Sequence, residues 1–313
     1  MSVDSAGGDV RVICGPTGAG KSTIALWLAE RGATTVISAD SRQIYRGFDI
    51  GTAKPTVDER ARVPHRGVDI VDPTERYSAA AWAASADGWI DRALADASTP
   101  LVVGGTGLYM RALFDGLFDE PTSDAAARRA LEICLGTLSV DELRRWTKAL
   151  DPARAHLGRT QLLRAIEIAL LTGHRVSELH RDRVRAPRWR PRYLVVDPGP
   201  ALVGRIAARL DDMLNHGWID EVERLMQTVP PDAPAWNATG YDAIRRVVRG
   251  ELTRAAARDT ILIHTRQYAK RQRTWFRHQL PPERVTRVDP LARDWCDTVA
   301  RWCDARSRHE TLT

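Results

Sequence analysis

The stretch Gly15-Pro-Thr-Gly-Ala-Gly-Lys21-Ser22 decides the fold of this 313-residue chain. The apolar run Val10–Cys14 precedes it, and Ser22–Arg31 follows it with the apolar spacing of a helix. The stretch matches G-x-x-x-x-G-K-[ST] between a strand and a helix, which is the pattern of a phosphate-binding loop. In such a loop the backbone N–H groups turn inward, Lys21 supplies a charge and the Ser22 hydroxyl can ligate Mg²⁺. The sequence therefore predicts a ligand that carries a pyrophosphate or polyphosphate group.

Strand-like and helical segments alternate around this loop. Short apolar runs occur at Thr35–Ser38, Val68–Val71 and Leu101–Val103, and Ser78–Ala95 has helical spacing. This alternation predicts an α/β fold with a P-loop NTPase-like parallel sheet and helices on both of its faces.

From about residue 121 the pattern is purely helical. Asp124–Leu135, Val140–Leu150 and Gln161–Leu171 have helical spacing, and the next strand candidate is Tyr193–Val196. We therefore expect an all-helical insertion domain at residues 121–192, within a catalytic core formed by residues 1–120 and 193–313.

Two further features of the second half concern its charge. The run from Arg175 to Arg192 holds seven arginines against two acidic residues, and we expect an exposed linker or the rim of a binding channel. The helix Ala201–Leu214 and long basic helices through Arg277 then return the chain to the core.

The composition excludes several classes of protein. Lysine and arginine number 46 against 40 acidic residues, and 43% of the residues are hydrophobic, so a soluble globular protein is expected rather than a disordered chain. No apolar run approaches the length of a membrane span, and the first ten residues contain no basic residue. We expect a cytoplasmic protein with no membrane partner. The four cysteines form no C-x-x-C pair, so neither a zinc site nor a disulfide framework is expected.

The run that follows the second strand narrows the class of protein. Asp40 ends that strand, and by itself it could be a magnesium-site residue or a base. It opens the run Asp40-Ser41-Arg-Gln43-Ile-Tyr45-Arg-Gly-Phe-Asp-Ile-Gly-Thr-Ala-Lys54-Pro55. This run resembles the signature of the tRNA dimethylallyltransferases, also called tRNA isopentenyltransferases. The resemblance covers roughly residues 10–280, and its other segments are Pro64-His65, Asp69–Pro73, Tyr77-Ser78, Leu101–Tyr109, Arg164–Glu167, Thr172-Gly173, Gly240-Tyr241 and Thr265–Arg277.

The resemblance implies a specific reaction. A dimethylallyl group would pass from dimethylallyl diphosphate to the exocyclic amine of adenine at position 37 of tRNA, beside the anticodon. That amine is a weak neutral nucleophile, so the reaction needs a base and stabilisation of the departing diphosphate. The resemblance implies Asp40 as the general base, Thr106 close to the diphosphate and the base, and Arg209 as a clamp on the diphosphate, so that Asp40, Thr106, Lys21 and Arg209 form the catalytic set. It implies diphosphate binding by Gly15, Pro16, Thr17, Gly18, Ala19, Gly20, Lys21, Ser22 and Arg209, with Mg²⁺ as cofactor at Ser22.

The segment Thr265–Arg277 suits contact with RNA. It holds five basic residues, no acidic residue and three aromatic ones, so a basic helix with phosphate contacts and stacking is expected. The family pattern has an arginine three residues before Arg164, where this chain has Gln161. The tRNA-binding residues implied by the resemblance are Asp40, Ser41, Arg42, Gln43, Thr106, Arg128, Gln161, Arg164, Gly240, Tyr241, Arg266, Gln267, Lys270, Arg271 and Arg273.

Three alternatives share the phosphate loop. A P-loop small-molecule kinase would leave Asp40–Pro55 unexplained, and an NTP-gated RNA-binding module would leave Asp40 without a role. A prenyltransferase acting on free adenine nucleotide would not need the insertion or the basic helix. The resemblance suggests a monomer and implies no protein partner.

Overall fold

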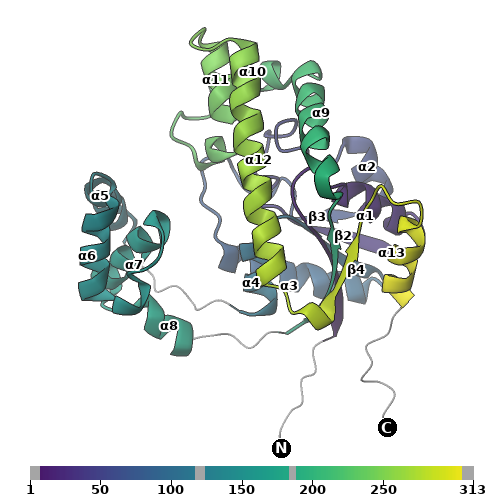
Figure 1. The fold of residues 1–313 in the computed structure, drawn as a ribbon, viewed down its shortest axis with the longest axis horizontal. Coiled ribbons are helices and arrows are strands. Elements are labelled where there is room, and N and C mark those ends of the chain that lie inside the picture. The colour runs from purple at the N-terminus through teal and green to yellow at the C-terminus, as the bar shows by residue number, and fades with distance from the viewer. Residues whose placement is uncertain (1–7, 117–123, 183–187, 305–313) are drawn as a thin grey trace, which may run out of the picture. The chain divides into compact units, whose positions relative to one another are not determined.

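The computed structural model describes residues 8–116, 124–182 and 188–304. The chain forms two compact units, a large one made of residues 1–114 and 188–313 and a small one made of residues 115–187 (Figure 1). These boundaries lie a few residues before the expected ones at 121 and 192. Among the described residues, no helix is long and apolar enough to cross a membrane.

A six-stranded parallel sheet forms the centre of the large unit, in the order β3-β2-β4-β1-β5-β6. β5 follows the small unit in the chain and pairs with β1 at the middle of the sheet. The predicted parallel sheet is therefore confirmed, with four strands supplied before the insertion and two after it. The strands are β1 (Asp9–Cys14), β2 (Thr34–Ala39), β3 (His65–Arg66), β4 (Thr99–Gly104), β5 (Arg190–Val196) and β6 (Val285–Val288).

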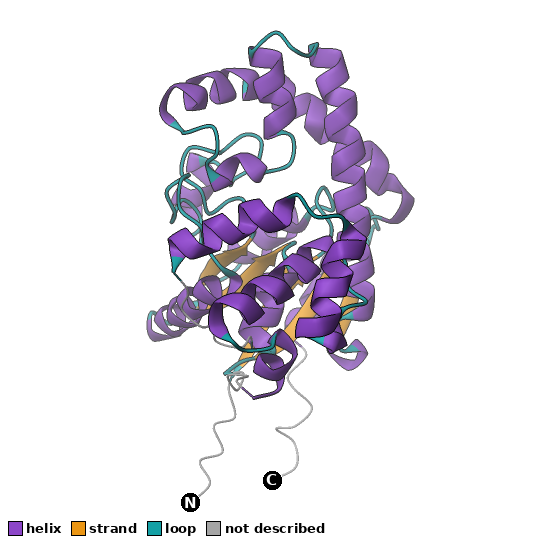
Figure 2. Ribbon diagram, turned by 90° about the vertical axis from the view of Figure 1, so that its left-hand side faces the viewer, coloured by secondary structure: helices purple, strands orange, loops and turns teal. Residues whose placement is uncertain are grey.

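Helices cover both faces of this sheet (Figure 2). On one face Ile13 and Leu101 pack in a core that includes Ile24 and Trp302. On the other face Trp82 donates a hydrogen bond from its indole N–H to the carbonyl oxygen of Ser38. The helices of the large unit are α1 (Lys21–Ala29), α2 (Val57–Arg62), α3 (Ala79–Ala95), α4 (Gly107–Phe114), α9 (Leu202–Asn215), α10 (Trp218–Thr228), α11 (Tyr241–Val248), α12 (Arg254–His278) and α13 (Trp295–Asp304).

The strand predicted at Val68–Val71 is wrong. β3 lies at His65–Arg66, and within the predicted run only Val71 forms an isolated bridge, with Tyr45. The physical reason is Asp69, whose positive φ of 56° breaks the extended backbone. Its carboxylate is held instead in ion pairs with Lys54 and Arg60.

The linker predicted from the charge run is also wrong where the structure describes it. α8 (Val176–Asp182) occupies its first part, and β5 begins at Arg190. Between them Trp189 is buried, and its indole N–H donates to Asp87. Residues 183–187 of the run lie outside the described residues. The basic run is thus divided between a helix of the small unit and a strand of the large unit.

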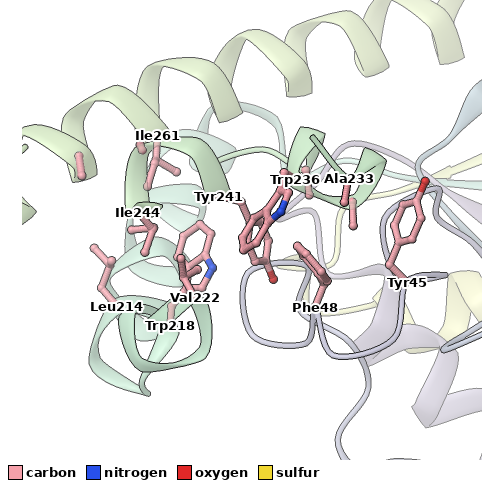
Figure 3. Close-up of a cluster of buried hydrophobic side chains, with 14 of the residues drawn as sticks. Tyr45, Phe48, Leu214, Trp218, Val222, Ala233, Trp236, Tyr241, Ile244 and Ile261 are labelled. Atoms are coloured by element: carbon pink, nitrogen blue, oxygen red, sulfur yellow. The ribbon is translucent and has the colours of Figure 1, made fainter. Parts of the chain in front are cut away.

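A second hydrophobic core joins the loop after β2 to the helices α9–α12 (Figure 3). Phe48 lies at its centre, with ring centroids 5.0 Å from Trp236 and 4.8 Å from Tyr241. Trp218 packs on the other side of Tyr241, at 5.5 Å. These aromatic contacts fix the loop that begins at Asp40 on a helical base.

The small unit is helical throughout its described residues. It contains α5 (Ala125–Gly136), α6 (Val140–Leu150), α7 (Arg159–Thr172) and α8 (Val176–Asp182), of which the first three agree with the predicted segments. Leu135, Leu143, Leu162 and Ile166 form its core. Short-range capping starts its helices, as at Ser139, whose hydroxyl and backbone N–H exchange hydrogen bonds with Glu142.

Candidate active site

The phosphate loop turns between the end of β1 and the start of α1. Gly15 has φ 146° and lies so close to β5 that a Cβ there would be 2.2 Å from the carbonyl oxygen of Val196. Gly20, which caps α1, has φ 99°. Side chains other than hydrogen are excluded at both positions, so the glycines of the motif are required by the turn and by the neighbouring strand.

Three cations from α1 and α9 converge on this loop. Lys21 Nζ donates to the carbonyl oxygen of Pro16 at 2.8 Å, and Arg205 Nε donates to that of Gly18 at 3.0 Å. Arg209 lies 3.4 Å from the Thr17 hydroxyl. Burial and, to a smaller extent, the nearby charge of Arg209 together lower the pKa of Lys21 to about 8, while Asp40 opposes the shift. Burial also lowers the pKa of Arg209. A bound anion would relieve both the desolvation and the repulsion of these cations.

Asp40 and Thr106 follow neighbouring strands, β2 and β4. Thr106 Oγ1 accepts a hydrogen bond from the Ser41 N–H at 3.1 Å, and Asp40 Oδ1 accepts one from the Arg42 N–H at 2.9 Å. Tyr268 of α12 lies close to Asp40, and burial together with the charge of Asp40 raises the pKa of Tyr268 to about 12. The carboxylate and the two hydroxyls are thus gathered at the carboxyl edge of the sheet, where ligands bind in open α/β folds.

A cavity of about 590 Å³ joins the phosphate loop, Arg205 and Arg209 to Asp40 and Tyr268, whereas Thr106 lies next to its lining residue Gly105. One part of its wall is polar and includes the phosphate loop, Asp40, Arg209 and Gln272. Another part is apolar and contains Leu210, Met213, Trp218, Ala238 and Ile261. A ligand with an anionic head and a short hydrocarbon tail matches such a wall, and Asp40 is available to hold or accept a proton.

Comparisons with known proteins identify the family of this chain. A family model described as IPP transferase matches residues 43–279, and one described as isopentenyl transferase matches residues 8–64. The tRNA dimethylallyltransferase of Ralstonia pickettii is 41% identical over 96% of both chains. The chain belongs to the tRNA dimethylallyltransferase family.

Solved structures of the family share the fold as well. A tRNA isopentenylpyrophosphate transferase from Bacillus halodurans is 32% identical, with a TM-score of 0.66 over 94% of each chain. A eukaryotic dimethylallyltransferase acting on tRNA is 27% identical, with a TM-score of 0.77 over 94% of this chain and 77% of that one. The similarity of this dimethylallyltransferase-family chain to solved structures therefore extends over nearly its whole length.

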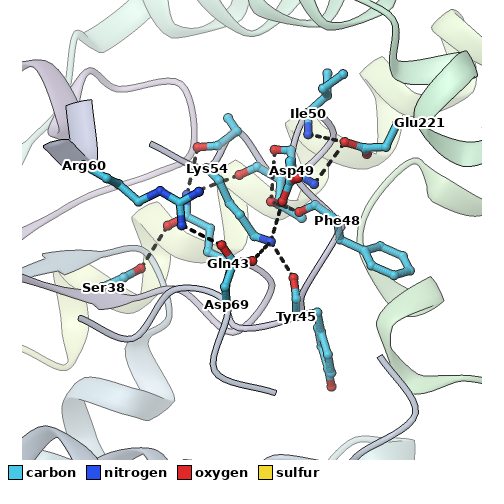
Figure 4. Close-up of polar contacts among 12 residues, drawn as sticks. Ser38, Gln43, Tyr45, Phe48, Asp49, Ile50, Lys54, Arg60, Asp69 and Glu221 are labelled. Atoms are coloured by element: carbon cyan, nitrogen blue, oxygen red, sulfur yellow. Dashed lines mark hydrogen bonds and ion pairs between the residues drawn. The ribbon is translucent and has the colours of Figure 1, made fainter. Parts of the chain in front are cut away.

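The loop Asp40–Pro55, which carries the family signature, is held by a buried polar network (Figure 4). Lys54 is buried and its ammonium contacts Asp49, Asp69 and the carbonyl oxygen of Tyr45. Gln43 donates to the carbonyl oxygens of Thr52 and Ala53 and accepts from the Ser38 hydroxyl. Gln43 therefore closes the loop on itself while also lining the cavity.

Two of the expected tRNA-binding residues, Tyr241 and Gly240, pack against other parts of the protein and are not exposed on its surface. Tyr241 is fully buried and donates to Glu221 at 2.7 Å. Glu221 also accepts from the backbone N–H groups of Asp49 and Ile50, so it joins α10 and α11 to the signature loop. Gly240 has φ 95° at the start of α11, where a Cβ would lie 2.4 Å from Trp218.

α12 separates its basic residues from its aromatic ones. Arg266, Gln267, Lys270 and Arg271 are exposed. Phe276 is buried, and the ring of Trp275 lies against Gly107. Arg273 is half-buried and contacts Asp197 and the carbonyl oxygen of Gly199. The exposed basic stripe is available to RNA, whereas these aromatics belong to the packing of the helix.

The remaining expected tRNA-binding residues belong to the small unit. Arg128 and Arg164 both form ion pairs with Glu167, whose side chain is 8% exposed. Gln161, which replaces the family arginine, is exposed and accepts a hydrogen bond from the Gly158 N–H at the start of α7. At this position the side chain supports a helix start.

Sequence reasoning missed several residues of the site. Arg205 precedes Arg209 by four residues, which places both on one face of a helix, so spacing could have found it. Tyr268 and Gln272 lie in the quoted Thr265–Arg277 segment, one helical turn apart, and both line the cavity. Only their neighbours in space reveal their functions.

Proposed function

We propose that this enzyme transfers the dimethylallyl group of dimethylallyl diphosphate to the exocyclic amine of adenine 37 in the tRNA anticodon loop. The cavity carries this proposal, because it joins half-buried cations at a phosphate loop to apolar walls and to Asp40. A prenyl diphosphate has the matching anionic head and apolar tail. The printed names of the relatives, which act on tRNA, support the acceptor.

The phosphate loop would stabilise the leaving group. Its backbone N–H groups, Lys21 and Arg209 lie where charge develops as the carbon–oxygen bond of the donor breaks. Because these cations are already desolvated and held by helices, they require little reorganisation during the reaction. The bonding electrons leave with the diphosphate.

Asp40 would act as the general base. The amine nitrogen bonds to the donor's first carbon, and one amine proton passes to the Asp40 carboxylate. Thr106, fixed by the Ser41 N–H, would orient the acceptor beside Asp40. Adenine must leave the anticodon stack to reach a carboxylate at the sheet edge, as other enzymes that modify bases require.

The residues fit a magnesium ion held mainly by the substrate. Ser22 is exposed at the start of α1 and offers a hard oxygen donor. The described residues contain no group of three or more His, Cys, Asp or Glu that could hold a metal. Ser22 would therefore hold Mg²⁺ together with diphosphate oxygens and water, and the ion would neutralise charge on the leaving group.

tRNA would contact the exposed stripe of α12, namely Arg266, Gln267, Lys270 and Arg271, and the exposed Gln161 of the small unit. Arg128 and Arg164 would act indirectly, through their ion pairs with Glu167. Ser41 and Arg42 lie beside Asp40 and would touch the target base. Arg273, Gly240 and Tyr241 would act indirectly, because their side chains or backbone positions are engaged within the protein.

One assay tests the whole proposal. Dimethylallyl diphosphate, Mg²⁺ and unmodified tRNA should yield prenylated tRNA, and the same tRNA with guanine at position 37 should yield none. AMP as acceptor and ATP as donor serve as controls for the two other enzyme classes. Transfer to AMP but not to tRNA, or phosphoryl transfer from ATP, would overturn the proposal.

A further inference from the structure

Gln272 lies buried under the phosphate loop, 6% exposed, on the inner face of α12. Its Oε1 accepts a hydrogen bond from the Thr17 N–H at 2.9 Å. Its Nε2 donates to the carbonyl oxygen of Gly105, also at 2.9 Å. A single side-chain amide thus spans two loops at the carboxyl edge of the sheet.

These two loops serve the two halves of the proposed reaction. Thr17 belongs to the loop that would hold the diphosphate, and Gly105 precedes Thr106, which would orient the acceptor. The spacing between them therefore sets how the leaving group lies relative to the attacking amine. Misplacement of reacting groups by as little as about 1 Å can cost roughly 10²-fold in rate.

Gln272 leaves no room for a side chain at Gly105. A Cβ at this position would lie 2.3 Å from Gln272 Nε2, whereas the next atom outside that side chain, the carbonyl oxygen of Gly15, is 3.3 Å away. Gly105 has no positive φ, so its backbone would accept an alanine. The methyl group of an alanine would mainly displace the glutamine amide.

α12 also connects this amide to the surface. Tyr268, one turn before Gln272, lines the same cavity, and Ala269 packs in the core against the sheet. The exposed side of the same turns carries Lys270 and Arg271. The inner side of α12 therefore contacts the phosphate loop and the turn that contains Gly105 and Thr106. Its outer side carries the exposed basic stripe that we propose contacts tRNA.

We propose that Gln272 is a positioning residue that sets the spacing between the phosphate loop and the Thr106 turn. The proposal rests on the proposed function, because the benefit of this spacing is the alignment of donor and acceptor. Gln272 acts through Thr17 and Gly105. Loss of its amide would leave a buried N–H and a buried carbonyl without partners, and the two loops would move to satisfy them.

Gln272→Met tests this directly, because methionine has a similar length but cannot make either hydrogen bond. We expect the dissociation constant of inorganic pyrophosphate and the KM of dimethylallyl diphosphate to rise about tenfold, with kcat also about tenfold lower. The KM of tRNA should stay within about twofold, because the outer stripe of α12 is unchanged.

Gly105→Ala provides an independent second variant. It should reproduce the effect by displacing the amide, and the double variant Gly105→Ala/Gln272→Met should be no worse than either single variant. It also keeps the proposal testable if Gln272→Met fails to fold. Gln227→Met, the same change at an exposed position of α10, is the matched control and should leave all constants unchanged.

Two outcomes would overturn the proposal. Additive effects of Gly105→Ala and Gln272→Met would show that the two positions act separately. A lower folded fraction with unchanged pyrophosphate affinity per folded molecule would show a purely structural role. Pyrophosphate binding requires no acceptor, so failure of the wild-type protein to modify tRNA would refute the proposed function separately.

Discussion

The site of the large unit and the small helical unit are built from opposite kinds of contact. At the site, Gln272 meets Thr17 across 255 positions of sequence and Thr106 meets Ser41 across 65. In the small unit, helix starts are secured by partners three positions apart, as in Ser139 with Glu142 and Gly158 with Gln161. The first arrangement makes each residue's function depend on the whole fold, and the second makes a helical module that local sequence can specify.

The two regions also differ in how they treat buried charge. Lys21 and Arg209 lie half-buried near each other, and the pKa of each is lowered by desolvation. In the small unit, Arg128 and Arg164 share the buried carboxylate of Glu167. The site therefore holds its cations ready for an anionic substrate, whereas the small unit uses its cations to stabilise helix packing.

Asp40→Asn should produce the largest loss of activity, because it removes the proposed general base of the site. We expect kcat to fall about 10²-fold or more, because the amide cannot accept the amine proton. Pyrophosphate affinity, measured by calorimetry, should remain close to that of the wild type. Asp232→Asn, at an exposed carboxylate, is the control. Full activity of Asp40→Asn would remove Asp40 as the base.

Glu167→Gln should test the other region in the comparison, because we expect it to destabilise the small unit and leave the large unit unchanged. Two arginines lose a buried counter-charge, so we expect about 2 kcal/mol of destabilisation, discounted for their partial exposure. Faster hydrogen exchange of the α5 and α7 amides would measure it. Glu178→Gln, in an exposed pair with Arg175, should cost almost nothing. Equal protection in both variants would contradict the assignment.

The pH dependence of the reaction should show that a desolvated cation of the site, Lys21, is required for donor binding or transfer. The pKa of Lys21 is lowered to about 8, so its charge is complete below this pH and is lost above it. The kcat/KM for the donor should therefore fall about tenfold per pH unit above pH 8, since this constant reports groups of the free enzyme. Lys21→Arg, which keeps its charge, should be less active but lack this alkaline decline. The same decline in both proteins would exclude Lys21 as its cause.

Arg271→Ala should give the smallest effect. Arg271 is exposed on α12, with its guanidinium 5.8 Å from the ring of Tyr268. Loss of one phosphate contact should weaken tRNA binding several-fold and reduce the slope of log affinity against log salt by about 1. Arg301→Ala on α13 is the control. An unchanged slope would mean that Arg271 does not meet a phosphate.

Sequence reasoning located features whose physics is local. The phosphate loop was predicted because its glycines and its flanking strand and helix are contiguous, and the helices of the small unit because their apolar spacing and caps are short-range. It failed at Val68–Val71, where ion pairs of Asp69 with distant residues outweigh the apolar pattern. It also missed β6, a short strand that pairs with β5 at the sheet edge.

The sequence by itself determined the family, the phosphate loop and the positions of Lys21, Asp40, Thr106 and Arg209 in the chain. Only the tertiary structure decided that Tyr241 is buried against Glu221 and that Lys54 holds the signature loop through its ion pair with Asp49. The same is true of Gln272, which joins two loops of the site by hydrogen bonds. The reason is that the sequence gives the type of a residue but not whether its side-chain amide or carboxylate faces water or a backbone N–H. Its function is set by the partner that folding brings to it.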